Sequence, residues 1–170
     1  MWYIRADMRP QTPYTKDLGD REPVPTMRET VGKIHGIAGR WTPEQLEKSY
    51  APGKWTARQI LIHLAQSELA LGNRARMALS TPNYVSQAFD QDSWMAREGG
   101  GPASSGASGS VALQALVAMS AFNCAFFDSL TPAQRATPFT HPEYGALTVD
   151  WLIHQMAGHL VHHLKQLETM

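Results

Sequence analysis

The sequence predicts an all-α protein, a four-helix bundle with a long loop between the second and third helices. Four stretches of roughly 15–25 residues place their apolar side chains on one arc at the helical period. No alternating pattern of a useful strand length occurs. Burying four such arcs together favours a bundle. The chain has 170 residues, so we expect a single domain over residues 1–170, with residues 1–21 as an irregular N-terminal arm.

The first predicted helix begins after Pro23 and Pro25, because proline is tolerated in the first turn of a helix. Its apolar positions recur at steps of three and four residues: Met27, Val31, Ile34, Ala38 and Trp41. Residues 42–46 then form a short capped turn, and Pro52-Gly53 breaks the chain before the next helix.

The second predicted helix is capped by Thr56 and stops at residues 81–83, Thr-Pro-Asn. A long connection follows from Tyr84 to about Gly109. Its glycine-rich part, residues 99–109, is interpreted as a flexible linker. It is not preceded by a strand and lacks the Lys-Ser/Thr ending of a phosphate-binding loop.

The third predicted helix runs from about Ser110 to Leu130 and ends at Thr131-Pro132. Residues 141–145, His-Pro-Glu-Tyr-Gly, form a turn. Thr148 then caps the last helix, which continues to about Glu168.

Charge and cysteine content limit the classes of function. Fifteen basic and fifteen acidic residues cancel, so no global field favours nucleic acid or an anionic membrane. No stretch approaches about 20 apolar residues, and the N-terminus lacks an apolar signal region. The single cysteine, Cys124, excludes an internal disulfide and suits a reducing compartment. We therefore expect a cytoplasmic protein whose metal ligands, if any, are histidines and carboxylates.

Histidines on the second and last helices are candidate metal ligands. His159 and His163 are four residues apart, so they project from the same face of a helix. On the apolar arc of the last helix His163 lies inside and His159 lies at the edge, whereas His154 and His162 point away. His63 lies at the edge of the arc of the second helix. Spacing and phase therefore select this triple, but three ordinary buried histidines remain an open alternative.

Six motifs occur in one order within residues 25–168: residues 53–68, 74–76, 81–82, 89–94, 139–148 and 157–166. In this combination they resemble the DinB/YfiT-like superfamily. The resemblance implies a four-helix bundle that holds one divalent metal, usually nickel, zinc or iron, with three histidines. These fall on His63, His159 and His163. Many relatives carry a polar residue, often aspartate, directly after the first histidine of the last helix, where this chain has Leu160.

Three histidine ligands leave a metal with an open position, which is typical of a catalytic site. Such a metal activates water or a thiol. The resemblance implies either a hydrolase or a transferase that uses a low-molecular-weight thiol, acting on a small molecule, and it also implies a homodimer. The alternative is a non-catalytic metal-binding, stress-associated interaction protein. A di-iron bundle is disfavoured because the Glu-x-x-His pairs that such bundles need on two helices are lacking.

Glu68 on the second helix is a candidate partner of a metal ligand or a catalytic base. The favoured interpretation is instead a carboxylate that pairs with Arg74 or Arg76.

The pocket is expected to open beside the connection 84–109, with Asp90 and Trp94 as candidate residues at its mouth. A polar loop with an aromatic anchor is the favoured alternative for these two. His141 and Tyr144 are interpreted as turn residues, and Cys124 as a core thiol.

Overall fold

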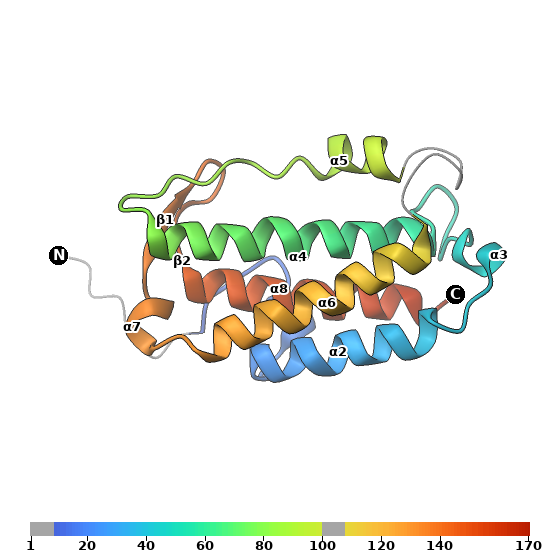
Figure 1. Ribbon diagram of the computed structural model, residues 1–170, viewed down its shortest axis with the longest axis horizontal. Coiled ribbons are helices and arrows are strands. Elements are labelled where there is room, and N and C mark those ends of the chain that lie inside the picture. Colours follow the sequence, from blue (N-terminus) through green and yellow to red (C-terminus); the bar gives the residue numbers. More distant parts are fainter. Residues whose placement is uncertain (1–8, 100–107) are drawn as a thin grey trace.

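Four long helices form a bundle in the computed structural model, which describes residues 9–99 and 108–170 (Figure 1). The predicted fold class, an all-α four-helix bundle, is confirmed. The long helices are α2 (Pro23–Ala38), α4 (Ala57–Ser80), α6 (Gly109–Asp128) and α8 (Val149–Leu167). The shorter elements are α1 (Thr15–Leu18), α3 (Pro43–Leu46), α5 (Gln91–Glu98), α7 (Pro132–Arg135), β1 (Pro138–His141) and β2 (Gly145–Thr148).

Side-chain caps fix the starts of the two helices that carry the candidate ligands. The hydroxyl of Thr56 accepts a hydrogen bond from the backbone N–H of Gln59, and the Gln59 side chain accepts one from the backbone N–H of Thr56. This reciprocal arrangement satisfies N–H groups that the helix itself leaves free. Thr148 caps α8 in the simpler way, accepting from the backbone N–H of Trp151. Both predicted helix starts are therefore correct.

The long connection after α4 sets the topology of the bundle. It returns along α4, so α4 and α6 run in the same direction, while α2 and α8 both run the opposite way (Figure 1). Each of α4 and α2 packs against both α6 and α8. Because α4 and α8 are antiparallel neighbours, the first turns of α4 lie beside the last turns of α8.

The core lies along the axis of the bundle and takes side chains from all four long helices. Each large apolar side chain removed from water there contributes about 1.5–3 kcal/mol. The largest fully buried side chains are Phe127, Met27, Ile34, Ile60, Leu61, Ile62, Leu64, Leu116, Leu152, Ile153, Met156 and Leu160.

A short hairpin joins α7 to α8 where the sequence predicted only a turn. Strands β1 and β2 pair in antiparallel register from Pro138 with Thr148 to His141 with Gly145. Gly145 has a φ of 73°, which favours glycine. The connection after α4 bonds to this hairpin, because the backbone N–H of Ser86 donates to Thr140 O and that of Thr140 donates to Tyr84 O. The sequence did not predict the hairpin because four-residue strands give only a weak alternation of apolar and polar residues.

The described part of the N-terminal arm, residues 9–21, packs on α8 and is not wholly irregular, because it contains α1. The indole N–H of Trp151 donates to Gln11 O at 2.8 Å, and Lys165 pairs with Asp17 at 2.7 Å. A Cβ on Gly158 would come within 2.6 Å of Tyr14 O. The missing side chain of Gly158 therefore lets the arm approach α8 closely.

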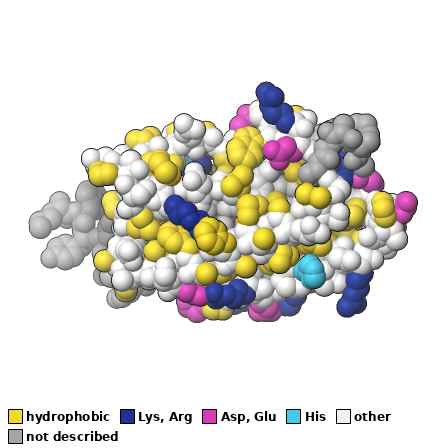
Figure 2. Space-filling model, in the orientation of Figure 1, with side chains coloured by type: hydrophobic (Ala, Val, Ile, Leu, Met, Phe, Trp, Pro, Cys, Tyr) yellow, Lys and Arg dark blue, Asp and Glu magenta, His cyan; other side chains and the backbone are white. Residues whose placement is uncertain are grey.

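Helix α6 is more apolar than the sequence analysis allowed. Its mean hydropathy is 1.6, and among the described helices it alone has the length and composition to cross a membrane. In the structure it packs against α2 and α4. Apolar side chains gather on the face of α4 and α6 shown in Figure 2. The exposed large apolar side chains of these two helices include Leu69 and Met77 of α4 and Phe122 of α6, of which Phe122 is 68% exposed.

Candidate metal centre

The ring nitrogens of His63, His159 and His163 converge between α4 and α8. The Nε2 atom of His159 lies 2.8 Å from Nε2 of His63 and 3.0 Å from Nε2 of His163. One ligand atom from each ring lies within 4.8 Å of the other two, and all three side chains are buried. The structure thus brings together the three histidines that helical phase selected.

The antiparallel packing of α4 and α8 explains this convergence. His63 is near the start of α4, and His159 and His163 are near the end of α8. The other two histidines of α8 bond elsewhere: Nδ1 of His154 lies 2.9 Å from Asp150 O, and Nδ1 of His162 lies 3.3 Å from the carboxylate of Asp17. His162 therefore faces the N-terminal arm, not the cluster.

A glutamine orients one of the three rings. The Nδ1 atom of His163 lies 2.7 Å from Oε1 of Gln166, and an amide oxygen only accepts hydrogen bonds. The proton of His163 is therefore on Nδ1, which leaves the lone pair of Nε2 directed at the other rings. Such a partner on the remaining nitrogen is the usual arrangement for a metal-binding histidine. Nδ1 of His63, in contrast, is buried and has no hydrogen-bond partner among the described residues.

All three imidazoles are held neutral. Burial lowers the pKa of His63 to about 3 and that of His163 to about 4. Burial, together with the neighbouring histidines, lowers the pKa of His159 well below its usual value. Neutral imidazole is the form that binds metal ions. Three such nitrogen donors fit zinc, nickel or iron better than the oxygen-seeking magnesium or calcium.

A cleft of about 340 Å³ opens beside His63 and His159. Its walls come from α4, α8, the hairpin, the N-terminal arm and the connection after α4. Its lining includes Tyr14, Arg74, Phe89, His141, Glu143 and Trp151. The predicted opening beside the connection agrees with the position of Phe89 and Gln91 in this wall.

Aromatic side chains surround the histidines. Ring centroids lie 4.8 Å apart for Trp55 and His63, 5.1 Å for Tyr14 and His159, and 6.4 Å for Phe89 and His63. Burial raises the pKa of Tyr14, so its hydroxyl stays protonated at neutral pH. The sequence analysis missed Tyr14 because it treated the arm as irregular. Gly158, inside a helix and beside His159, was the available signal of a close approach.

Glu68 lies outside the cleft, in the interface between α4 and α6. The Nδ2 group of Asn123 donates to the Glu68 carboxylate at 2.7 Å, and Asn123 Oδ1 accepts from Arg76 at 2.7 Å. No ion pair joins Glu68 to Arg74 or Arg76 among the described residues, so the favoured pairing was wrong. Burial raises the pKa of Glu68 to about 7.

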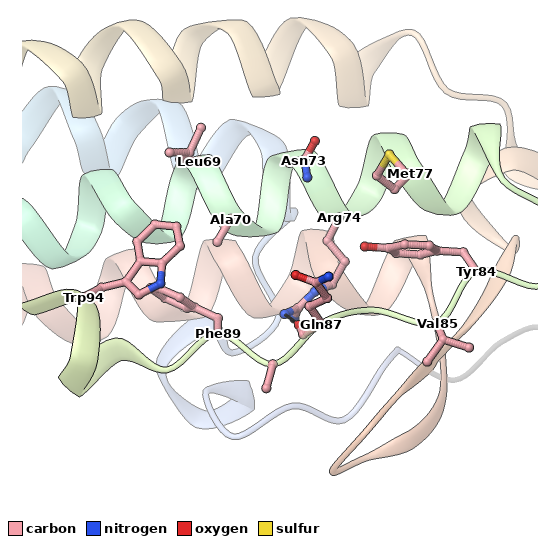
Figure 3. Close-up of a pocket in the computed structure, with 11 residues that line it drawn as sticks. Leu69, Ala70, Asn73, Arg74, Met77, Tyr84, Val85, Gln87, Phe89 and Trp94 are labelled. Carbon is pink, nitrogen blue, oxygen red and sulfur yellow. Dashed lines mark hydrogen bonds between the residues drawn. The ribbon is translucent and has the colours of Figure 1, made fainter.

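Neither candidate residue of the connection lines the cleft beside the histidines. The Asp90 carboxylate caps α5 by accepting from the backbone N–H of Ser93 at 3.0 Å. Trp94 lines a second cleft, of about 400 Å³, on the outer side of α4 (Figure 3). The ring of Phe89 is 4.9 Å from that of Trp94 and borders both clefts. Most of the glycine-rich stretch, residues 100–107, lies outside the described residues.

Two named proteins are similar to this chain in sequence. "Putative metal-dependent hydrolase OB0782" of Oceanobacillus iheyensis is 29% identical over 128 residues, which cover 75% of this chain and 71% of that protein. "Putative metal-dependent hydrolase YfiT" of Bacillus subtilis is 25% identical over 169 residues, covering 99% of this chain and 92% of that protein.

A solved structure agrees on the fold. It is described as "YfiT from Bacillus subtilis is a probable metal-dependent hydrolase with an unusual four-helix bundle topology". It superposes with a TM-score of 0.77 at 23% identity and covers 95% of this chain and 88% of that chain. The family model of the DinB superfamily matches residues 26–167. The chain therefore belongs to the DinB superfamily.

Proposed function

We propose that this protein is a metal-dependent enzyme in which His63, His159 and His163 hold one divalent transition metal: nickel, zinc or iron. The observation that carries the proposal is the convergence of three neutral imidazole nitrogens at the wall of a cleft. Relatives named as metal-dependent hydrolases support the same general class. Which of the three metals is bound depends on supply as well as on affinity, so occupancy is the firmer part of the proposal.

The proposed reaction is hydrolysis, or transfer to a low-molecular-weight thiol, of a small molecule. A divalent metal with three protein ligands lowers the pKa of bound water toward about 7 and does the same for a thiol. Side chains that line the cleft form the surroundings of the metal and the substrate. Tyr14, Phe89 and Trp151 contribute aromatic surface to a cleft whose other walls are largely polar. The protonated hydroxyl of Tyr14 is available to donate a hydrogen bond to a substrate oxygen.

Metal analysis and a turnover screen test this function. Protein purified without a histidine tag should contain about one divalent transition metal per chain. The metal-loaded protein should hydrolyse an ester or transfer a thiol to or from a small electrophile, and treatment with a chelator should abolish the turnover. Protein that stays folded but neither retains nor takes up zinc or nickel would contradict the proposal. Metal-loaded protein without turnover across both substrate classes would instead favour the non-catalytic, stress-associated interaction protein.

For partners, we propose a small-molecule substrate, no nucleic acid or membrane, a cytoplasmic location and a homodimer. The exposed apolar side chains on α4 and α6 give the homodimer a surface (Figure 2). On the same surface the guanidinium of Arg76 lies 4.6 Å from the ring centroid of Phe122. Light scattering should give the mass of two chains for the native protein and of one chain for Phe122→Glu. A native mass of one chain would overturn the dimer.

A further inference from the structure

Arg74 is a buried cation that forms no ion pair in the described part of the chain, although the charge of Glu143 acts on it from beyond ion-pair distance. Its side chain is 6% exposed. Its guanidinium donates a hydrogen bond to Gln87 O, at 2.8 Å, and forms no ion pair with any described residue. Arginine remains charged in proteins, and burying an unpaired charge is costly. Arg74 borders the cleft that contains His63 and His159, and it also borders the second cleft, drawn in Figure 3, where its side chain lies beside Gln87.

His141 offers a hydrogen-bond donor to the same cleft. Its Nδ1 atom accepts from the backbone N–H groups of Glu143, at 3.1 Å, and Tyr144, at 3.4 Å. An imidazole nitrogen that accepts carries no proton, so the proton of the ring is on Nε2. Burial, and then the nearby guanidinium of Arg74, lower the pKa of His141. The ring is therefore a neutral Nε2–H donor in the wall of the cleft, close to Arg74.

We propose that Arg74 and His141 bind a carboxylate group of the substrate. This inference rests on the proposed function insofar as it takes the cleft to be the substrate site. A guanidinium and an N–H donor are the groups that recognise a carboxylate. The cleft holds one arginine and also Glu143. A single negative charge therefore suits this wall better than the dianion of a phosphate monoester.

The position of Arg74 also limits the shape of the substrate. Arg74 and His63 are both on α4, and 74 − 63 gives eleven residues, or about 16 Å of helix. The two backbone positions are thus about three turns apart on α4, and we place the carboxylate on the Arg74 side of the cleft, away from the group that reacts at the histidines. Phe89 and Trp151 line the same cleft and supply apolar contact. The substrate class is thus an extended carboxylic acid with an apolar body.

Titration of metal-free protein with simple acids tests this inference separately from the metal. The probes are 4-phenylbutyrate, its neutral amide and 3-phenylpropyl phosphate. Binding of each probe is measured by two-dimensional NMR of ¹⁵N-labelled protein. We expect the carboxylate to bind about tenfold or more tightly than the amide, because it accepts charge-assisted hydrogen bonds. It should also bind more tightly than the phosphate.

Four variants locate the binding. Arg74→Met should remove the preference for the carboxylate over the amide. His141→Asn should reduce it, because an amide oxygen preserves the hairpin bonds to Glu143 and Tyr144 but the Nε2 donor is lost. Glu143→Gln should strengthen carboxylate binding by removing a competing charge. Arg76→Met is the matched control, since Arg76 is on the same helix but borders α6 and not the cleft.

Three results would overturn the inference: equal binding of acid and amide, an unchanged preference in folded Arg74→Met, or tighter binding of the phosphate. Should Arg74→Met fail to fold, an unchanged preference in His141→Asn would overturn the paired site. The metal proposal is judged by metal content alone. Carboxylate preference in a protein that never binds metal would therefore refute the proposed function and leave this inference standing.

Discussion

Two buried polar clusters share helix α4 and differ in what completes them. His63 and Glu68 are five residues apart, and each side chain is 3% exposed. Glu68 faces α6, where Asn123 donates to both its carboxylate and its backbone oxygen. His63 faces α8, where its Nε2 atom meets the Nε2 atoms of two other histidines beside a cleft. The chain itself supplies hydrogen-bond partners to the Glu68 carboxylate, whereas the three Nε2 atoms of the second cluster converge on one another beside open space.

Burial and a shifted pKa therefore do not identify a functional site by themselves. The pKa values of Glu68 and His63 are both strongly shifted, and burial is the main cause in each. The two clusters differ in their access to solvent and in the hydrogen-bond partners that the chain supplies. Changes in the Glu68 cluster, which is closed to solvent, should alter stability and its pH dependence. Changes in the histidine cluster, which is open to the cleft, should alter ligand binding. The predictions below test this division, beginning with the largest effect.

Replacing His163 should affect the open cluster most strongly. His163→Ala removes one of three ligands, and we expect metal affinity to fall by more than about 100-fold, since loss of a mere supporting partner costs about 10–100-fold. His162→Ala is the matched control, because His162 supplies no nitrogen to the cluster: its Nδ1 faces Asp17 and its Nε2 lies 3.2 Å from the amide nitrogen of Gln166. It should leave the metal content nearly unchanged. Both are measured by titration with zinc in the presence of a competing chelator, and equal losses would refute the assignment of ligands.

Replacing Glu68 should change the pH dependence of stability. The pKa of Glu68 is about 7 in the folded protein, against an ordinary value of 4.5. Between these values the folded chain holds a proton that the unfolded chain has lost. The carboxyl group therefore contributes full stability below pH 4.5, and this contribution is lost as pH rises to about 7. The total loss is about 3 kcal/mol.

Glu68→Gln should therefore be the more stable protein above neutral pH, by as much as about 3 kcal/mol, because the amide never ionises and still accepts from Asn123. Urea unfolding of metal-free native and variant proteins across this pH range measures the difference. The titration of the histidines is common to both proteins and cancels. If the free energies of unfolding of the two proteins change with pH in parallel, Glu68 is not a buried carboxyl group that stays protonated in the folded protein.

A smaller effect, on stability, is expected where the N-terminal arm packs on α8 beside the histidine cluster. Gly158→Ala places a Cβ within 2.6 Å of Tyr14 O and 2.7 Å of its Cβ. We expect a loss of about 1–3 kcal/mol from overpacking, together with greater solvent exposure of Trp151, whose indole N–H bonds to Gln11 O. Calorimetry and tryptophan fluorescence measure these changes. Gly36→Ala is the control, because a Cβ there meets no atom within 4 Å. If the two variants behave alike, the arm does not depend on Gly158.

The sequence predicts the bundle well because helices are specified locally. Apolar period and capping residues identified the starts of α4 and α8 at Thr56 and Thr148. Helical phase also separated His163 from His162, since the period of a helix fixes which residues share a face. The resemblance to the superfamily supplied the same three histidines independently.

The walls of the cleft were not predictable in the same way, because they depend on contacts between distant segments. Tyr14 reaches His159 only through the docking of the arm. His141 joins the cleft through the pairing of two four-residue strands. The Glu68 partner, Asn123, is 55 residues away in the sequence. A periodic pattern along one helix carries no information about such partners.

The central claim is that three histidines from α4 and α8 bind one metal ion. Anomalous X-ray diffraction from crystals of tag-free protein grown with zinc or nickel tests it most directly. The account predicts one strong peak at about 2.0–2.1 Å from the Nε2 atoms of His63, His159 and His163. A folded protein without a peak at this position, or with its metal held by other residues, would contradict the claim.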